Sequence, residues 1–273
     1  MATKFIKYEK ALLKIASTSI FAENASLEFS ASLEPVTNIT GSVIRYASQG
    51  PVKGTLSFSH YCTGDFHEFL NPLSAIEHTG EPFNGSFAGM TFESGYVKSL
   101  SFSVAPYQPI LFESEIDIYG SLGTLSDDGE SDRNFEGYVS EEESVPIGHG
   151  LRSFLAGDDL GINKKMSFNY SVSTDRNPVV LIGSESPSRI TKENVMINMT
   201  VVGEDFGNAI TYSGISANAI IKIYDVYGVS PLAEFGCTGQ IYSDKLSVGA
   251  NGFMQGELSL SQKYLTGKVE VWF

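Results

Sequence analysis

The sequence predicts a mainly β protein with two tandem antiparallel β-sandwich or barrel domains, each containing at most one short helix. Polar and apolar residues alternate along many short segments, as strands with one buried face require. Similar segments recur in the same order in the two halves of the chain. The 273 residues, 42% hydrophobic and 12% aromatic, are enough for two folded domains and too apolar for a disordered chain.

The internal repeat is clearest at 26–32 and 167–173. The first segment reads Ser-Leu-Glu-Phe-Ser-Ala-Ser and the second reads Ser-Phe-Asn-Tyr-Ser-Val-Ser. Later segments also correspond: 55–62 with 194–201, 95–103 with 252–261, and 116–119 with 269–272. We therefore expect a tandem duplication, with a first domain at 1–120, an acidic linker or long loop at 121–145, and a second domain at 146–273.

The first domain begins with a basic arm and continues as strands. The arm carries Lys4, Lys7, Lys10 and Lys14 against the single acid Glu9. Period-two alternation predicts strands at 26–33, 43–47, 54–62, 87–92, 96–104 and 111–119. Apolar residues three or four apart at 65–77 instead predict one short helix, with Asp65 as its N-cap.

The linker is strongly acidic. It contains Asp127, Asp128, Glu130, Glu141, Glu142 and Glu143, with Arg133 as its only base. Runs of acids are most often solvated spacers. The alternative is that these acids contact the lysine arm of a neighbouring subunit, which would make that contact sensitive to salt.

The second domain is expected to repeat the strands of the first, at 166–173, 194–202, 219–226, 239–247, 252–261 and 267–273. Cys62 and Cys237 fall at places that do not correspond between the repeats, so two buried or half-buried free thiols are predicted. The chain has no apolar run near the roughly 20 residues that span a bilayer, and its start lacks the apolar core of a secretory signal. We expect assembly in a cytoplasm and no membrane partner.

One face of the predicted strands is lined with small polar residues. Its members are Ser26, Glu28, Ser30, Ser32, Ser167, Asn169, Ser171 and Ser173. Small hydroxyl groups suit a smooth, wet surface that is crowded by neighbouring copies. The alternative is that serine and threonine are simply tolerated on any exposed antiparallel strand.

Catalytic and metal-binding patterns are weak. His60, Cys62, Asp65 and His67 lie close together and could in principle bind zinc. Their spacing matches no familiar structural zinc site, and the second repeat has Met199, Val201, Asp205 and Gly207 at the equivalent positions. No Gly-X-Ser-X-Gly motif accompanies the histidines. We expect no metal, no cofactor and no enzymatic activity.

The formal net charge of −14 argues against a protein that wraps nucleic acid, because that requires clustered lysine and arginine. An acidic channel wall is compatible with it, since such a wall repels a polyanion and lets it slide.

The chain resembles tail tube proteins of long-tailed bacteriophages. The resemblance rests on element order: an alternating strand ending at Gly41-Ser42, a hairpin through 44–54, another alternating strand, a short helix after Gly64-Asp65-Phe66, and Ser-rich final strands. It implies β-sandwich domains in six-fold rings, whose inner sheets join around a channel. Three copies of a duplicated chain would supply the six domains.

The function implied is that of a structural virion protein in the phage tail. Its partners would be itself as stacked trimeric rings, other tail proteins, and DNA that passes through the lumen without specific binding. The polar face would line the lumen, and the lysine arm and the linker acids would make contacts between subunits. The acidic linker and the unequal repeats leave open a baseplate, hub or terminator protein. From another class, a carbohydrate-binding or adhesive β-sandwich is the alternative.

Overall fold

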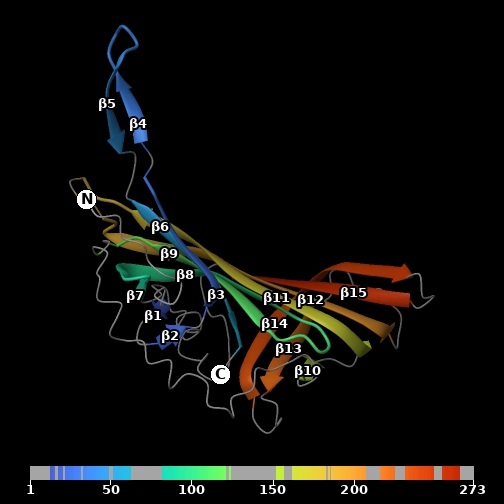
Figure 1. The fold of residues 1–273 in the computed structure, drawn as a ribbon. Helices are drawn as coiled ribbons and strands as arrows, with labels where there is room; N and C mark the ends of the chain where they lie inside the picture. Colours follow the sequence, from blue (N-terminus) through green and yellow to red (C-terminus); the bar gives the residue numbers. More distant parts are fainter. Residues whose placement is uncertain are drawn as a thin grey trace.

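The computed structural model describes residues 13–15, 18–20, 22–31, 33–48, 52–62, 82–120, 123, 152–156, 162–182, 184, 186–206, 216–224, 231–248 and 254–264. This part is mainly antiparallel β-structure, which confirms the prediction of a mainly β protein (Figure 1). The described residues contain no helix, so none that could cross a membrane. The strands are β1 (Leu13–Ile15), β2 (Thr18–Ile20), β3 (Ala22–Ser30), β4 (Leu33–Thr37), β5 (Val43–Ser48), β6 (Lys53–Tyr61), β7 (Phe83–Phe87), β8 (Met90–Val104), β9 (Leu111–Ile118), β10 (Arg152–Ala156), β11 (Ile162–Val179), β12 (Arg189–Phe206), β13 (Ser216–Tyr224), β14 (Pro231–Val248) and β15 (Met254–Tyr264).

The two halves of the chain have the same strand order. In the first half, hydrogen-bonded neighbours run β1-β7-β8-β9-β6-β3. In the second half they run β10-β13-β14-β15-β12-β11. Each strand of one run therefore has a counterpart in the other, while β2, β4 and β5 stand outside the two runs. This order matches β8 with β14 and β9 with β15, whereas the sequence similarity pairs 95–103 with 252–261, one strand further along.

The halves join through a shared strand pair. The first part of β8 pairs with β7. Its last part pairs with β11 instead, from Ser99↔Ser173 to Val104↔Phe168. The opposite edge of the same stretch of β8 pairs with β9. One continuous sheet therefore runs from β3 of the first half to β10 of the second.

The buried hydrophobic side chains form one cluster that spans both halves. At its centre the rings of Phe102, Phe112, Tyr170 and Phe235 contact one another, and the Phe102 and Phe235 centroids lie 4.7 Å apart. These rings come from β8, β9, β11 and β14. Because Phe235 of β14 contacts rings of β8 and β9, the sheet must curve enough to bring these strands together. The aromatic cluster lies beneath the joint between the halves.

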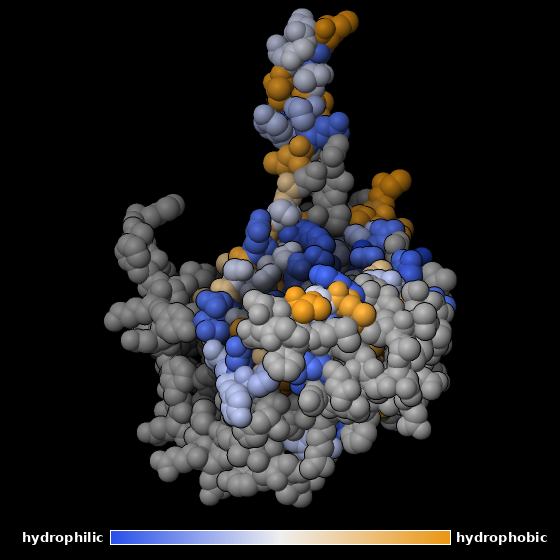
Figure 2. Space-filling model, turned by 90° about the vertical axis from the view of Figure 1, so that its right-hand side faces the viewer, coloured by the Kyte–Doolittle hydropathy of each residue, from blue (hydrophilic) through white to orange (hydrophobic). Residues whose placement is uncertain are grey.

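The hairpin β4–β5 projects away from the body of the molecule (Figure 1). The Oδ1 atom of Asn38 accepts hydrogen bonds from the backbone of Thr40 and Ser42, and Gly41 adopts a φ of 81°, which closes the turn. Ile39, Ile44 and Tyr46 are exposed. In Figure 2 the hairpin at the top shows hydrophobic residues in orange among hydrophilic ones in blue.

Several predicted boundaries need correction. The sequence predicts separate strands at 87–92 and 96–104, but residues 90–92 and all of 96–104 belong to the single strand β8. Ser94 takes a φ of 56° and Gly95 lies under the ring of Phe83, so the strand bends there without ending. β11 and β12 are also longer than predicted, because their hairpin continues past the sheet. The predicted helix at 65–77, the strand at 267–273 and almost all of the acidic linker lie outside the described residues.

Candidate functional site

The polar face of the sheet is the candidate site. Because side chains alternate between the two faces of a strand, directly paired residues on neighbouring strands form rows across the sheet. One row is polar through nine strands: Asn24, Ser59, Glu113, Ser101, Ser171, Asn198, Ser261, Gln240 and Ser216. The row passes from β8 to β11 without interruption, so the polar face is common to both halves.

The opposite face carries the core, and its rows are as regular. One such row contains His60, Phe112, Phe102, Tyr170, Met199 and Leu260, all of them buried. A strand that buries one face and exposes the other stabilises a definite register, because a shift by one residue would exchange the faces. The same pattern therefore fixes both the core and the polar face.

In the first half the polar face is hollowed. A groove of about 560 Å³ crosses β3, β6, β9 and β8. Most of its lining is small and hydroxylated, and its only charged members are two carboxylates. The lining residues are Asn24, Ala25, Ser26, Ser57, Phe58, Ser59, Ser99, Ser101, Glu113, Ser114 and Glu115.

Local contacts hold the carboxylates of the groove. Lys98 Nζ lies 2.6 Å from Glu115 Oε1, and Ser101 Oγ lies 3.5 Å from Glu113 Oε2. The Lys98 and Glu115 side chains are 38% and 30% exposed, so water weakens their ion pair. On the second half, the Thr200 and Ser259 hydroxyls lie 3.1 Å apart. The face is a polar surface with little net positive charge.

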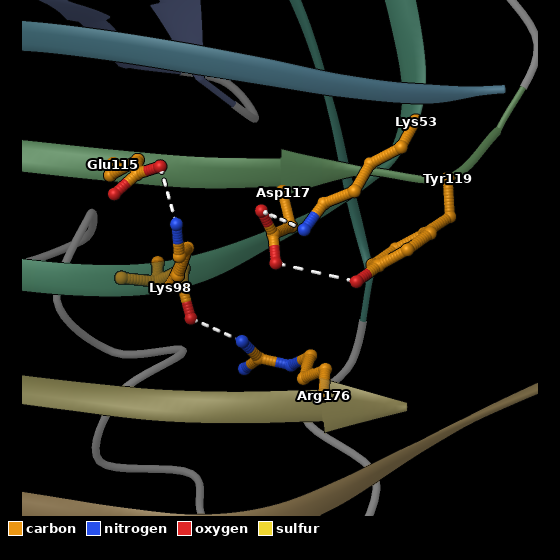
Figure 3. A network of polar contacts seen from close by, with 7 residues as sticks. Lys53, Lys98, Glu115, Asp117, Tyr119 and Arg176 are labelled. Carbon is orange, nitrogen blue, oxygen red and sulfur yellow. Dashed lines mark hydrogen bonds and ion pairs between the residues drawn. The ribbon is translucent and has the colours of Figure 1, made fainter. Parts of the chain in front are cut away.

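A denser network lies where the polar face meets the joint (Figure 3). Lys53 of β6 lies 3.0 Å from Asp117 of β9, and the Tyr119 hydroxyl donates to the other Asp117 oxygen at 3.3 Å. Arg176 of β11 donates to the carbonyl of Val97 in β8. Four strands from both halves are thereby connected.

Burial shifts the pKa of Tyr119 and the pKa of Arg176. Burial, reinforced by the charge of Asp117, raises the pKa of Tyr119 to about 12, so its hydroxyl stays protonated and donates to Asp117. Burial lowers the pKa of Arg176, while Asp117 and the two tyrosines oppose that shift. An arginine nonetheless remains charged at neutral pH. This network stabilises the joint between the two halves.

The structure places the predicted polar-face residues together where it describes them. Ser26, Glu28, Ser30, Asn169 and Ser173 are exposed, and Ser167 and Ser171 are half-buried. Ser171 pairs directly with Ser101 across the joint. Ser32 lies outside the described residues.

The residues predicted to contact other subunits are mostly beyond the described part of the chain. Lys14 lies in β1 and is half-buried. Lys4, Lys7 and Lys10 lie outside the described residues, as do all the named linker acids.

Two carboxylates of the groove, Glu113 and Glu115, are absent from the predicted set. The alternation of residues 111–118 places both on the polar face, beside Ser101 and Ser99. The internal repeat gives no signal for them, because its match in this strand covers only 116–119.

The possible zinc ligands do not converge in the described structure. His60 and Cys62 are both buried on the core side, and His60 stacks on Phe112 with centroids 5.7 Å apart. Asp65 and His67 lie outside the described residues. Among the residues that are described, no group of three or more histidines, cysteines and carboxylates could hold a metal ion.

The comparisons with known proteins give no identification. No family model matches the chain, and no curated protein is similar to it in sequence. The geometry of the polar face and of the joint is therefore the basis for inferring a function.

Proposed function

We propose that this protein is a structural virion protein of a phage tail tube, which assembles as a trimeric ring of duplicated domains and conducts DNA through a polar lumen. The observation that carries the proposal is the polar row that continues through nine strands and across the joint between two halves of identical strand order. The polar face lines the lumen, and the core face lies outside it.

The internal joint supports the ring. Two equivalent units are already joined edge to edge, through β11 of one unit and β8 of the other. Repeating a head-to-tail contact generates a closed ring when its rotation closes. If each chain supplies two units, three chains supply six, which gives the duplication a structural reason.

The chemistry of the polar face supports passage of DNA without specific binding. Hydroxyls and carboxylates line the groove, and one of these carboxylates, Glu115, is paired with Lys98. Strong DNA binding requires several cations that displace counterions from phosphate. A surface of this composition stays hydrated and does not retain the polyanion.

Assembly is tested by negative-stain electron microscopy of the concentrated protein, with its mass measured by light scattering. We expect hollow rings or tubes, and a mass in multiples of three chains. A monomer at every concentration contradicts the proposal. If that monomer is also retained on a glycan matrix, the carbohydrate-binding alternative replaces it.

The lumen assignment is tested with Ser26→Lys and Asn169→Lys, one exposed position in each half. Assembled particles of the double variant are expected to retain added DNA on sedimentation at low salt, while wild-type particles release it. Gln108→Lys, in the exposed turn after β8, is the matched control and should behave as wild type. Equal DNA retention by the double variant and the control contradicts a lumen on this face.

A further inference from the structure

Two strand edges of the described structure end the sheet at corresponding places. Within the described residues β3 pairs only with β6, although its counterpart β11 pairs with both β12 and β8. The last part of β14, after Gln240, pairs only with β15, although the last part of β8 pairs with both β9 and β11. The two open edges are thus the counterparts of the two strands that form the internal joint.

The side chains of β3 are less buried than those of β11. Phe168 and Tyr170 of β11 are 6% and 1% exposed. The matching residues of β3 in the internal repeat are Leu27 and Phe29, which are only half-buried against the core. The same alternation therefore leaves apolar surface uncovered where a neighbouring strand is missing.

The end of β14 also leaves apolar side chains exposed. Counting along the paired strands from the match of β3 with β11 aligns Ser99-Leu100-Ser101-Phe102 of β8 with Lys245-Leu246-Ser247-Val248 of β14. Leu100 and Phe102 are 1% and 4% exposed, while Leu246 and Val248 are 49% and 70% exposed. Burying apolar side chains is favourable in water, so both edges gain from being covered.

We propose that the end of β3 in one copy, at Phe29 and Ser30, pairs antiparallel with Ser247 and Val248 of β14 in a second copy, reproducing the joint between β11 and β8. This deepens the proposed function and rests on it, because it names the two surfaces that join one chain to the next. In the internal joint Ser171 pairs with Ser101 and Tyr170 with Phe102. The corresponding intermolecular pairs are Ser30 with Ser247 and Phe29 with Val248.

The occupant is a second copy of this chain because the internal joint supplies its template. Both partners of that template have counterparts on every chain, one on the open edge of β3 and one on the open edge of the last part of β14. A strand edge that lacks a neighbour also tends to pair with another strand, and the contact satisfies the backbone groups of both edges.

Cysteine cross-linking tests the pairing directly. The variant Ser30→Cys/Ser247→Cys, oxidised at the concentration at which the protein assembles, is expected to form disulfide-linked chains that migrate as dimers and trimers on non-reducing gels. The control Ser30→Cys/Gln108→Cys keeps the cysteine on β3 and moves the other off the β14 edge. The native Cys62 and Cys237 are buried and present in both variants, so any cross-linking through them is the same in the test and in the control.

A charge variant provides the second readout. Leu246→Glu is expected to raise the concentration needed for assembly by about tenfold or more, because it places a carboxylate in the new apolar contact. Leu181→Glu, at the exposed turn after β11, is the matched control. Circular dichroism confirms that both variants remain folded.

The outcomes separate this inference from the proposed function. Assembly with the specific cross-link and a weakened Leu246→Glu variant supports both. Assembly without the cross-link, and with Leu246→Glu matching its control, overturns the pairing and leaves the tube proposal standing. A wild-type chain that is monomeric at all concentrations overturns both.

Discussion

Arg176 in β11 donates a hydrogen bond from its guanidinium to the backbone carbonyl of Val97 in β8. Its guanidinium carbon also lies 5.1 Å from the centroid of the Tyr96 ring. A side chain of the second half is thereby fixed to the backbone and to an aromatic ring of the first. The contact lies just beyond the last backbone pair of the internal joint, Ser99↔Ser173.

We predict that Arg176→Ala lowers the free energy of unfolding by about 1–3 kcal/mol, since it removes a charged hydrogen bond and a cation–π contact. Urea denaturation at neutral pH measures this change. Arg189→Ala is the control, because Arg189 is exposed and its loss should change stability by less than about 0.5 kcal/mol. Equal effects of the two substitutions would show that Arg176 does not hold the joint.

His60 makes stability depend on pH. Burial lowers the pKa of His60 from 6.5 to about 4, so the folded protein holds it neutral while the unfolded chain protonates it near pH 6.5. The unfolded state therefore binds more protons between these values. Stability is complete above about pH 6.5 and falls by up to about 3 kcal/mol as pH drops toward 4.

The His60→Phe variant isolates this contribution. Phenylalanine keeps a ring against Phe112 and cannot be protonated, so the loss of stability between pH 7 and 4.5 should be smaller than in the wild type. Urea midpoints at the two pH values measure the difference. Parallel pH profiles for the two proteins would refute a role for His60.

Gly54 in β6 leaves space for the ring of Phe29 in β3. A Cβ atom at Gly54 would lie 2.2 Å from Phe29 Cε1, so Gly54→Ala must displace that ring. We expect a loss of about 1–3 kcal/mol in the free energy of unfolding. In a Phe29→Ala background the same substitution should cost less, and a double-mutant cycle measures the coupling. Additive effects would mean that the ring does not depend on this glycine.

The two cysteines are predicted to be unreactive in the folded protein. Both side chains are fully buried, and burial raises the pKa of each thiol to about 12. The nucleophilic thiolate is therefore scarce at neutral pH. Mass spectrometry after iodoacetamide treatment should find both thiols unmodified in native protein and modified in urea. Rapid native labelling of either residue would contradict its buried position.

The sequence predicts the strands and their faces because both depend on local alternation. Ser26, Glu28 and Ser30 lie on the polar side of β3, and Leu27 and Phe29 lie on the other side, as the pattern requires. The free, buried state of Cys62 and Cys237 is confirmed as well. These features depend on which side chains are apolar enough to be buried, and the sequence gives the polarity of every residue directly.

The strand pairing between the halves could not be predicted in the same way. Ser101 and Ser171 meet across the joint through backbone hydrogen bonds, which any pair of polar-faced strands could form. The bend at Ser94 interrupts the alternation and suggests two strands, although β8 continues through it. Glu113 and Glu115 become part of a groove only because β9 lies between β6 and β8.

The joint between β8 and β11 also determines how the protein responds to dilution. Its two strands belong to one chain, so they meet at an effective concentration fixed by the connecting segment and independent of how much protein is present. Dilution therefore leaves the Ser101 and Ser171 pair intact, whereas a contact between separate chains dissociates on dilution. In the proposed ring of six units, each chain would hold one joint within itself, so the ring would need three contacts between chains where six separate units would need six.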